Sequence, residues 1–423
     1  MWLVEAYHLK CVRALLSLIL PLALSGSARL QPKPLLSRAY LGTSGSESHF
    51  IESGEQPADD PLLLCLGGGP GCSALSALLY QIGPLSFNYN KSREGHKPVL
   101  ELNHYSWTKV ANIIFSDSPA GTGFSYSQNS ERCNTSDKKS VELAYEFLRK
   151  DLLFQPLSRK LRKVSDADRG IAGIKLGGYI LGNPFTDVKY DINSRVNFAH
   201  RFALIDDEIY EAAEVYCSGE YVHPNTSDSE CTVYLKIIDL CLKDIYSPMI
   251  LEPTCSISSL QLGPKILEWP LGVNPSEDLL SDFNPWEKLW CRNYYYLFVN
   301  VWANDKAVQE ALHVRNVLSS LPYHRNFTND DLRALIYSGD HDLIIPFLGT
   351  YEWIQSLNLS VSTDDEWRPW FVDGQIGGFM ELYKEKKYGI TFSTVQGAGH
   401  TAPEYKPKET CEMIRRWLAY YFV

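Results

Sequence analysis

The sequence has little charge, and what charge it has leans acidic. Charged residues make up 21% of the 423 residues, and the formal net charge is −10. No stripe of lysine and arginine with interleaved aromatic residues occurs, so nucleic acid is disfavoured as a partner. The hydrophobic fraction of 45% is enough for a large packed core, which excludes global disorder.

Metal-ligand and nucleotide patterns are also missing. The ten cysteines and ten histidines include no C-x-x-C or H-x-x-x-H spacing, and no Gly-Lys-Ser/Thr ending follows a glycine-rich loop. The first absence argues against structural zinc and the second against a phosphate-binding Walker loop. The sequence therefore predicts neither a metal nor a cofactor.

The N-terminal apolar run, 14–24, is too short to span a bilayer and contains Pro21. It follows Lys10 and Arg13 and ends in small residues, as in a cleavable leader. We therefore expect a signal peptide over 1–28, no stable membrane anchor, and a secreted or vacuolar protein.

Cysteine and sequon usage fits export. Nine cysteines follow the leader, and five of them lie from Cys217 to Cys291, which indicates a disulfide-stapled insertion. An odd count leaves at least one thiol without an internal partner, and Cys65 is the candidate. Five N-x-S/T sequons predict glycosylation, at Asn90, Asn134, Asn225, Asn326 and Asn358.

Short apolar runs alternate with amphipathic helical stretches, which predicts an α/β fold with a mostly parallel sheet. The expected strands are 62–66, 110–115, 175–181, 334–337 and 390–395, and the clearest helices are 141–152 and 407–420. Between 191 and 311 the pattern becomes helical, cysteine-rich and irregular. We interpret 191–311 as a cap inserted between two parts of a core, 29–190 and 312–423; no pattern indicates an oligomeric state.

Three strand ends carry chemistry-bearing residues. A loop of Gly67, Gly68, Gly69, Pro70 and Gly71 follows the first strand and exposes backbone N–H groups, as an oxyanion hole or a purely structural turn does. Asp340 and Asp342 follow the strand 334–337, and either could orient a histidine. His400 follows the strand 390–395 on a glycine-bearing loop. Glycine loop, aspartate and then histidine is the chain order of α/β-hydrolases.

These blocks resemble the serine carboxypeptidase-like family, peptidase family S10, from about residue 61 to the C-terminus. The resemblance rests on PLLLCLGGGPGCSALSALLYQIGPL, YSWTKVANIIFSDSPAGTGFSYS, GGYILGNPFTD, YSGDHDLIIPFLGTYEWI and GAGHTAPEYKP. It implies an α/β-hydrolase fold with a helical, disulfide-bearing cap, and a Ser-His-Asp mechanism of acyl transfer. By this resemblance Asp342 is the triad aspartate, His400 the general base and Gly69 an oxyanion donor. It also implies the disulfides Cys72–Cys291 and Cys217–Cys231.

The family's nucleophile is missing. It lies in a segment reading G-D/E-S-Y-S/A-G, before the GYILGN strand, yet none of the 28 glycines here opens G-x-S-x-G. A strand, a sharp elbow and a helix need roughly twenty residues with apolar periodicity. The stretch 157–172 is shorter, and half of its residues are Lys, Arg, Asp or Gly. We therefore predict a fold that is incomplete around the nucleophile elbow, in a truncated isoform.

A second departure concerns the substrate. Family carboxypeptidases usually show W-L-N-G-G-P-G, whose asparagine amide helps to hold a terminal carboxylate, but here Cys65 and Gly67 replace the tryptophan and the asparagine. The substrate-binding positions Gly67 and Gly68 resemble instead the plant acyltransferase branch, which uses glucose esters. The parent substrate is therefore a peptide C-terminus or an acyl-glucose ester.

Three functional interpretations follow. The first is an inactive serine carboxypeptidase-like protein, and the second is a non-catalytic glycoprotein that binds ligands through the preserved cleft. The third is an active enzyme, such as a glucose-ester acyltransferase, with a recruited serine; the candidates are Ser73, Ser125 and Ser158.

Overall fold

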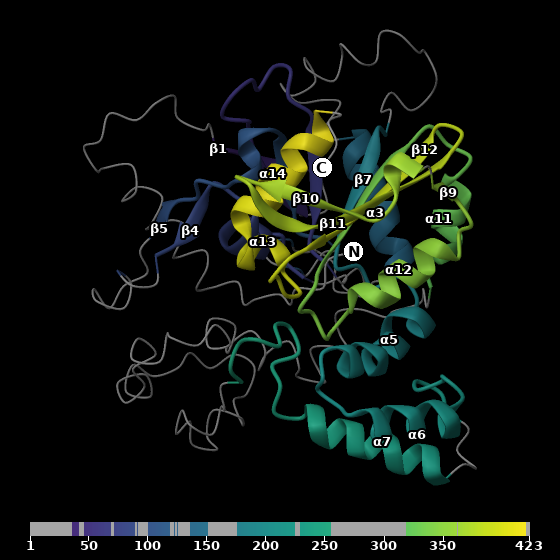
Figure 1. Ribbon diagram of the computed structural model, residues 1–423. Helices are drawn as coiled ribbons and strands as arrows, with labels where there is room; N and C mark the ends of the chain where they lie inside the picture. Colours follow the sequence, from purple (N-terminus) through teal and green to yellow (C-terminus); the bar gives the residue numbers. More distant parts are fainter. Residues whose placement is uncertain are drawn as a thin grey trace.

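The computed structural model describes residues 36–41, 46–68, 72–88, 91, 100–118, 122, 125, 136–150, 176–224, 229–254, 319–361 and 363–419. The expected leader 1–28 and the stretch 157–172 lie outside these residues. Figure 1 shows two sheets, with helices packed around them and a helical pair set apart.

The first sheet has four strands in the order β1-β2-β6-β3. β1 (Leu36–Leu41) and β2 (Ser46–Ile51) form an antiparallel hairpin, and β2 pairs with β6 (Asn112–Ser116). β6 then pairs in parallel with β3 (Leu62–Leu66). A small ribbon and two short helical turns accompany this sheet: β4 (Leu85–Phe87), β5 (Leu100–Leu102), the π-helical turn η1 (Ala77–Gln81) and the 3₁₀ turn η2 (Trp107–Lys109). The helix α3 (Asp137–Lys150) follows β6 in the chain.

The second sheet follows the order β10-β11-β12-β8-β7, with β9 paired to β11. Its parallel part is β7 (Gly178–Gly182), β8 (Arg333–Gly339) and β12 (Tyr388–Val395). Antiparallel strands extend it: β11 (Gln375–Glu385), β10 (Arg368–Val372) and β9 (Ser360–Val361). The helices that follow or flank these strands are α11 (Leu321–Phe327), α12 (Phe347–Gln355), the 3₁₀ turn η8 (Thr363–Asp365), α13 (Ala402–Tyr405) and α14 (Pro407–Leu418).

All five strands expected from the sequence are present, and each pairs in parallel, which confirms the α/β class. The first expected strand, Leu62–Leu66, has the bounds of β3, whereas β6 begins two residues after the expected 110. The delay has a local cause, because Ser106 caps η2 and Val110 closes that turn with a bond to the Trp107 carbonyl. The antiparallel strands at the outer ends of both sheets were not expected.

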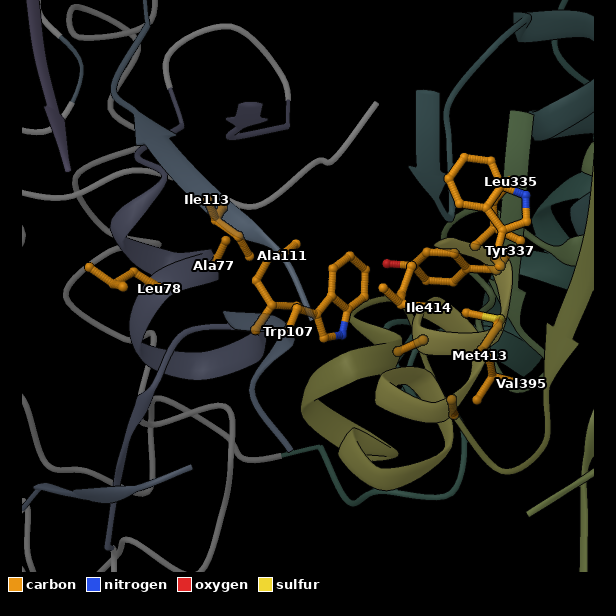
Figure 2. Packing of buried hydrophobic residues seen from close by; sticks show 14 of the residues in the cluster. Ala77, Leu78, Trp107, Ala111, Ile113, Leu335, Tyr337, Val395, Met413 and Ile414 are labelled. Atoms are coloured by element: carbon orange, nitrogen blue, oxygen red, sulfur yellow. The ribbon is translucent and has the colours of Figure 1, made fainter. Parts of the chain in front are cut away.

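One apolar core joins the two sheets. It takes Ile51, Ile113 and Phe115 from the first sheet, and Leu335, Tyr337 and Val395 from the second. Helix α14 adds Met413, Ile414 and Trp417, spaced as one helical face. Figure 2 shows the Tyr337 ring directed at the indole of Trp107, and the two ring centroids lie 6.4 Å apart in an edge-on arrangement. The Trp107–Tyr337 contact therefore bridges elements of the two sheets.

The expected insertion begins with three helices, α5 (Val188–Arg201), α6 (Asp207–Cys217) and α7 (Ser229–Leu242). Helix α5 runs across the boundary expected at residue 190 and packs against α12 of the core. Cys217 and Cys231 form the disulfide that the resemblance implied, and it ties α6 to α7. Figure 1 shows α6 and α7 side by side, away from the sheets. Among the described residues no helix combines the length and apolarity needed to cross a bilayer.

A buried polar cluster lies at the start of the second sheet. The Tyr179 hydroxyl on β7 is 2.9 Å from His324 Nδ1 and 2.7 Å from the Tyr388 hydroxyl. The His324 ring also packs on Trp353, with centroids 4.8 Å apart. Burial lowers the pKa of His324 from 6.5 to about 4. His324 is therefore held neutral well into the acidic range.

We expect Trp107→Ala to lower the free energy of unfolding by about 3–5 kcal/mol, because it empties a site between the sheets that is 3% exposed. Urea unfolding followed by circular dichroism measures this loss. Leu102→Ala is the matched control, because Leu102 is 52% exposed, and it should change stability by less than about 0.5 kcal/mol. Equal losses of unfolding free energy in the two variants would show that the Trp107–Tyr337 contact stabilises the fold no more than an exposed leucine does.

We also expect acid to destabilise the protein through His324. The pKa of His324 in the folded protein, about 4, lies below the ordinary 6.5. The neutral imidazole therefore contributes fully to the stability of the fold above pH 6.5, and this contribution is lost as pH falls toward 4. The loss amounts to about 3 kcal/mol at pH 4. Unfolding curves from pH 7.5 to pH 4 should therefore be less pH-dependent in His324→Gln than in the wild type. Parallel pH profiles for the two proteins would contradict this assignment.

Candidate active site

The candidate site is built on two neighbouring loops of the second sheet. β8 and β12 pair in parallel to their ends, with Val395 opposite Gly339, so the loops that follow leave the sheet at the same edge. Asp342 lies on the loop after β8, and His400 lies on the loop after β12. The sheet register therefore brings together two residues that are 58 positions apart in the sequence.

Asp342 and His400 form a hydrogen-bonded pair. His400 Nδ1 lies 2.8 Å from Asp342 Oδ2, and the two residues are 7% and 0% exposed. An ionised carboxylate only accepts hydrogen bonds, so Nδ1 carries the hydrogen and Nε2 is the basic nitrogen of the neutral ring. This is the arrangement that a histidine base needs from its orienting aspartate.

Two further donors satisfy the buried carboxylate. Asn183 Nδ2 donates to Asp342 Oδ2 at 2.8 Å, and the Ile344 backbone N–H donates to Oδ1 at 2.8 Å. With His400, three hydrogen bonds therefore reach this carboxylate. A buried charge is tolerated only when it is bonded in this way.

Sequence reasoning missed Asn183. It follows β7, adopts a left-handed backbone with φ of 43°, and is fully buried. Its backbone N–H donates to the Tyr337 carbonyl, and its Oδ1 accepts from the Gly339 N–H at 3.3 Å. An asparagine at the end of a strand in a GN dipeptide is a usable signal, because asparagine tolerates the left-handed region better than most residues.

The second aspartate of this motif has a different partner. Asp340 Oδ1 lies 2.6 Å from His341 Nδ1 and accepts the Gly397 N–H at 2.7 Å. Asp340 thus ties the two loops together, while Asp342 holds His400. The choice between the two aspartates, which the sequence left open, is settled by these bonds.

The glycine loop is only partly described. Gly67 and Gly68 follow β3 of the first sheet, but Gly69 lies outside the described residues, so its role as oxyanion donor stays a prediction. A Cβ atom at Gly67 would lie 2.3 Å from the Cys72 carbonyl oxygen. This backbone therefore has no room for the asparagine that family carboxypeptidases usually carry at that position.

The alternative nucleophiles that the structure describes, Ser73 and Ser125, both donate hydrogen bonds to Asp117. Ser73 Oγ donates to Asp117 Oδ1 at 2.7 Å, and Ser125 Oγ donates to the Asp117 carbonyl at 2.7 Å. Ser158 lies outside the described residues. Cys65 is a free thiol, as expected, but burial and the charge of Asp117 raise its pKa to about 12, so it stays protonated.

The remaining sequence candidates are partly covered. Asn326 and Asn358 are described and exposed, whereas Asn90, Asn134 and Asn225 lie outside the described residues. Cys291, the expected partner of Cys72, also lies outside them. The described residues hold no group of three or more His, Cys, Asp or Glu side chains arranged to bind a metal.

Two sheets that each contain parallel strands, flanked by helices, with an Asp–His pair on adjacent strand ends, are typical of the α/β-hydrolase class. The chain belongs to the serine carboxypeptidase family, peptidase S10, which it matches over residues 48–161 and 160–420. A crystal structure of KEX1(delta)p, a prohormone-processing carboxypeptidase from Saccharomyces cerevisiae, shares the fold with a TM-score of 0.56. That likeness covers 89% of this chain and 87% of that chain, at 17% identity.

Relatives from Arabidopsis thaliana are more similar in sequence. Serine carboxypeptidase-like 13 is 36% identical over 429 residues, which cover 91% of this chain and 90% of that protein. Serine carboxypeptidase-like 17 is 36% identical over 467 residues, covering 98% of each. This last alignment is longer than the 423-residue chain itself, so that relative has residues without a counterpart here.

We expect Asn183 to stabilise the buried carboxylate. Asn183→Gly keeps the backbone free to adopt its positive φ but removes the donor, and should cost about 2 kcal/mol. Asn183→Ala adds the strain of a left-handed alanine and should cost about 1 kcal/mol more. Denaturant unfolding measures both losses.

Lys386 provides the control, because it is exposed and has a φ of 54°. Lys386→Ala should leave stability nearly unchanged, because lysine and alanine both carry a Cβ in the same left-handed backbone, and Lys386→Gly should raise stability by up to about 1 kcal/mol. If Asn183→Gly stabilises the protein as Lys386→Gly does, the hydrogen bond to Asp342 carries no net stability.

Proposed function

We propose that this protein is a non-catalytic member of the serine carboxypeptidase family, which keeps the aspartate and histidine of the triad but has no nucleophile. In this proposal Asp342 orients His400, and Gly69 belongs to the oxyanion loop. The family's acyl transfer would start from a serine on a central strand and elbow. We propose that this strand and elbow are absent from the chain.

The observation that carries this proposal is the break in the sheet. Among the described residues, β3 ends one sheet and β7 ends the other, and no strand is paired between them. Both strands are only half-buried over most of their length, whereas β6 and β8 next to them are buried. A nucleophile strand would come after α3 and before β7 in the chain, which is where the deletion is predicted.

The comparisons with known proteins support the proposed absence of the nucleophile strand and elbow. The family match comes as two stretches that meet at residues 160–161, inside the segment where the nucleophile motif is missing from the sequence. The alignment with serine carboxypeptidase-like 17 is longer than this chain, as a deletion here requires. Loss of a nucleophile costs about a millionfold in turnover when the rest of a triad is kept, so a family member without one has little activity left.

The ligand class follows from the glycine loop. KEX1(delta)p is named a carboxypeptidase, so a peptide C-terminus is one ligand class for this fold. Residue 67 has no room for the amide that would hold a terminal carboxylate. We therefore favour an acyl-glucose ester, bound without turnover, over a peptide C-terminus.

We further propose that the chain is exported to the cell exterior or the vacuole. A disulfide between Cys217 and Cys231 suits an oxidising compartment. The leader 1–28 and the five sequons support the same route, and Asn326 and Asn358 are exposed as glycosylation requires. In this proposal the core comprises 29–190 and 312–423, and 191–311 forms the cap.

An active-site-directed fluorophosphonate tests the proposal. We expect no labelled serine in the purified, folded full chain, and acyl transfer about a millionfold below that of a relative with the complete motif. Folding is checked by circular dichroism and by a single species in size-exclusion chromatography. His400→Ala should leave the residual rate unchanged, because no serine depends on that base.

Stoichiometric labelling of one serine, abolished in His400→Ala, would overturn the proposal and identify a recruited nucleophile. An insoluble product from every expression host would indicate a defective chain rather than a binding protein. Binding of a glucose ester by the folded wild type, weakened in His400→Ala, is the result expected for a non-catalytic receptor.

A further inference from the structure

A short segment of the expected cap lies against both loops of the Asp342–His400 pair. We call residues 246–250 the cap strap. It makes three backbone hydrogen bonds to these loops. They run from Leu343 N to Ser247 O at 2.9 Å, from His400 N to Pro248 O at 2.7 Å, and from Ile250 N to His341 O at 3.2 Å.

The contact between the strap and the histidine loop is close. A Cβ atom at Gly399 would lie 2.1 Å from the Pro248 carbonyl oxygen and 2.9 Å from Met249 Cβ. Met249 is itself buried. Only glycine therefore lets the chain before His400 pass at this distance from the strap.

Helix α5, most of which lies within the expected cap 191–311, holds the aspartate loop. Arg195 on α5 donates from Nε and Nη2 to the Ile344 carbonyl at 2.9 and 2.6 Å. The N–H of the same residue, Ile344, donates to Asp342 Oδ1. Burial lowers the pKa of Arg195, while the negative charges of Asp342 and Asp191 act against that shift. The guanidinium thus places a positive charge near the buried carboxylate.

We propose that Arg195 and the cap strap are positioning elements of the Asp342–His400 pair, so that segments outside the two loops fix the geometry of the pair. Arg195 holds the aspartate loop through Ile344 and balances the carboxylate charge. The strap holds the backbone of His400. This inference concerns the pair itself and holds whether or not the chain turns over a substrate.

The direction in which Arg195 should shift the pKa of His400 follows from the charged groups around the pair. The titratable groups that the contacts and charge interactions place at the pair are Asp342 and His400 themselves, Asp340 and His341 on the aspartate loop, and Arg195 and Asp191 on α5. Among them Arg195 is the permanent positive charge, and it opposes protonation of His400. Removing it should therefore raise the pKa of His400.

Titration of His400 by NMR in the full chain tests the proposal, because a merely structural arginine would change stability without moving this pKa. We expect Arg195→Gln to raise the pKa of His400 by on the order of one pH unit. Loss of the resonance in His400→Gln assigns it. Arg201→Gln is the matched control, since Arg201 is exposed at the end of the same helix.

Burial raises the pKa of Asp191 to about 7, so Asp191 titrates in the pH range in which an imidazole ordinarily does. The comparison is therefore repeated in an Asp191→Asn background, where the same rise is expected. An unchanged pKa of His400 in folded Arg195→Gln overturns the role of Arg195. Should Arg195→Gln not fold, Arg195→Lys replaces it in the test of the positioning role, because lysine keeps the positive charge but loses the pair of hydrogen bonds from Nε and Nη2.

The rate at which the His400 Nδ1 hydrogen exchanges with water reports on the geometry of its hydrogen bond to Asp342. Arg195→Lys should speed this exchange, and so should Gly399→Ala, which pushes the strap away from His400. Gly177→Ala is the control, because a Cβ there meets nothing within 4 Å. Exchange as slow as in the wild type, in both Arg195→Lys and Gly399→Ala, overturns the proposal.

Discussion

The apolar core shared by the two sheets is the constraint on which the rest of the molecule depends. The glycine loop leaves β3 in one sheet, and the Asp342–His400 pair lies at strand ends of the other. No strand pairs the two sheets among the described residues, so side-chain packing has to fix one relative to the other. The edge-on contact of Trp107 with Tyr337 and the buried face of α14 supply that packing. The position of the glycine loop relative to the Asp342–His400 pair therefore depends on the packing of this core.

Two buried histidines illustrate how environment assigns different roles to one residue type. His400 lies against a carboxylate, which accepts the Nδ1 hydrogen, so Nε2 is the basic nitrogen of the ring. His324 lies among Trp353, Phe327 and a tyrosine hydroxyl, where burial opposes the charged form. His324 therefore makes the fold less stable as pH falls from 6.5 toward 4. His400 belongs to the candidate site, and His324 to stability.

The sequence predicted what depends on local pattern. β3 has its expected bounds, α14 begins at the expected Pro407, and the family resemblance implied the Asp342–His400 pairing. Asn183 and Arg195 were missed, because their roles depend on contacts with residues more than 140 positions away. The expected start of the cap falls inside α5, because the sequence pattern there becomes helical, cysteine-rich and irregular, and in the structure that helix packs on α12.

The support of the pair also explains how it can outlast the proposed loss of a nucleophile. Among the described residues, every donor to Asp342 comes from the residue after β7, from its own loop or from His400, and the backbone of His400 is held by the strap. None of these contacts comes from the segment between α3 and β7. A deletion confined to that segment therefore removes the attacking group and leaves the carboxylate fully bonded. Gradual decay would instead tend to replace Asp342 early, because a buried charge that has lost a partner destabilises the fold more than a neutral residue does.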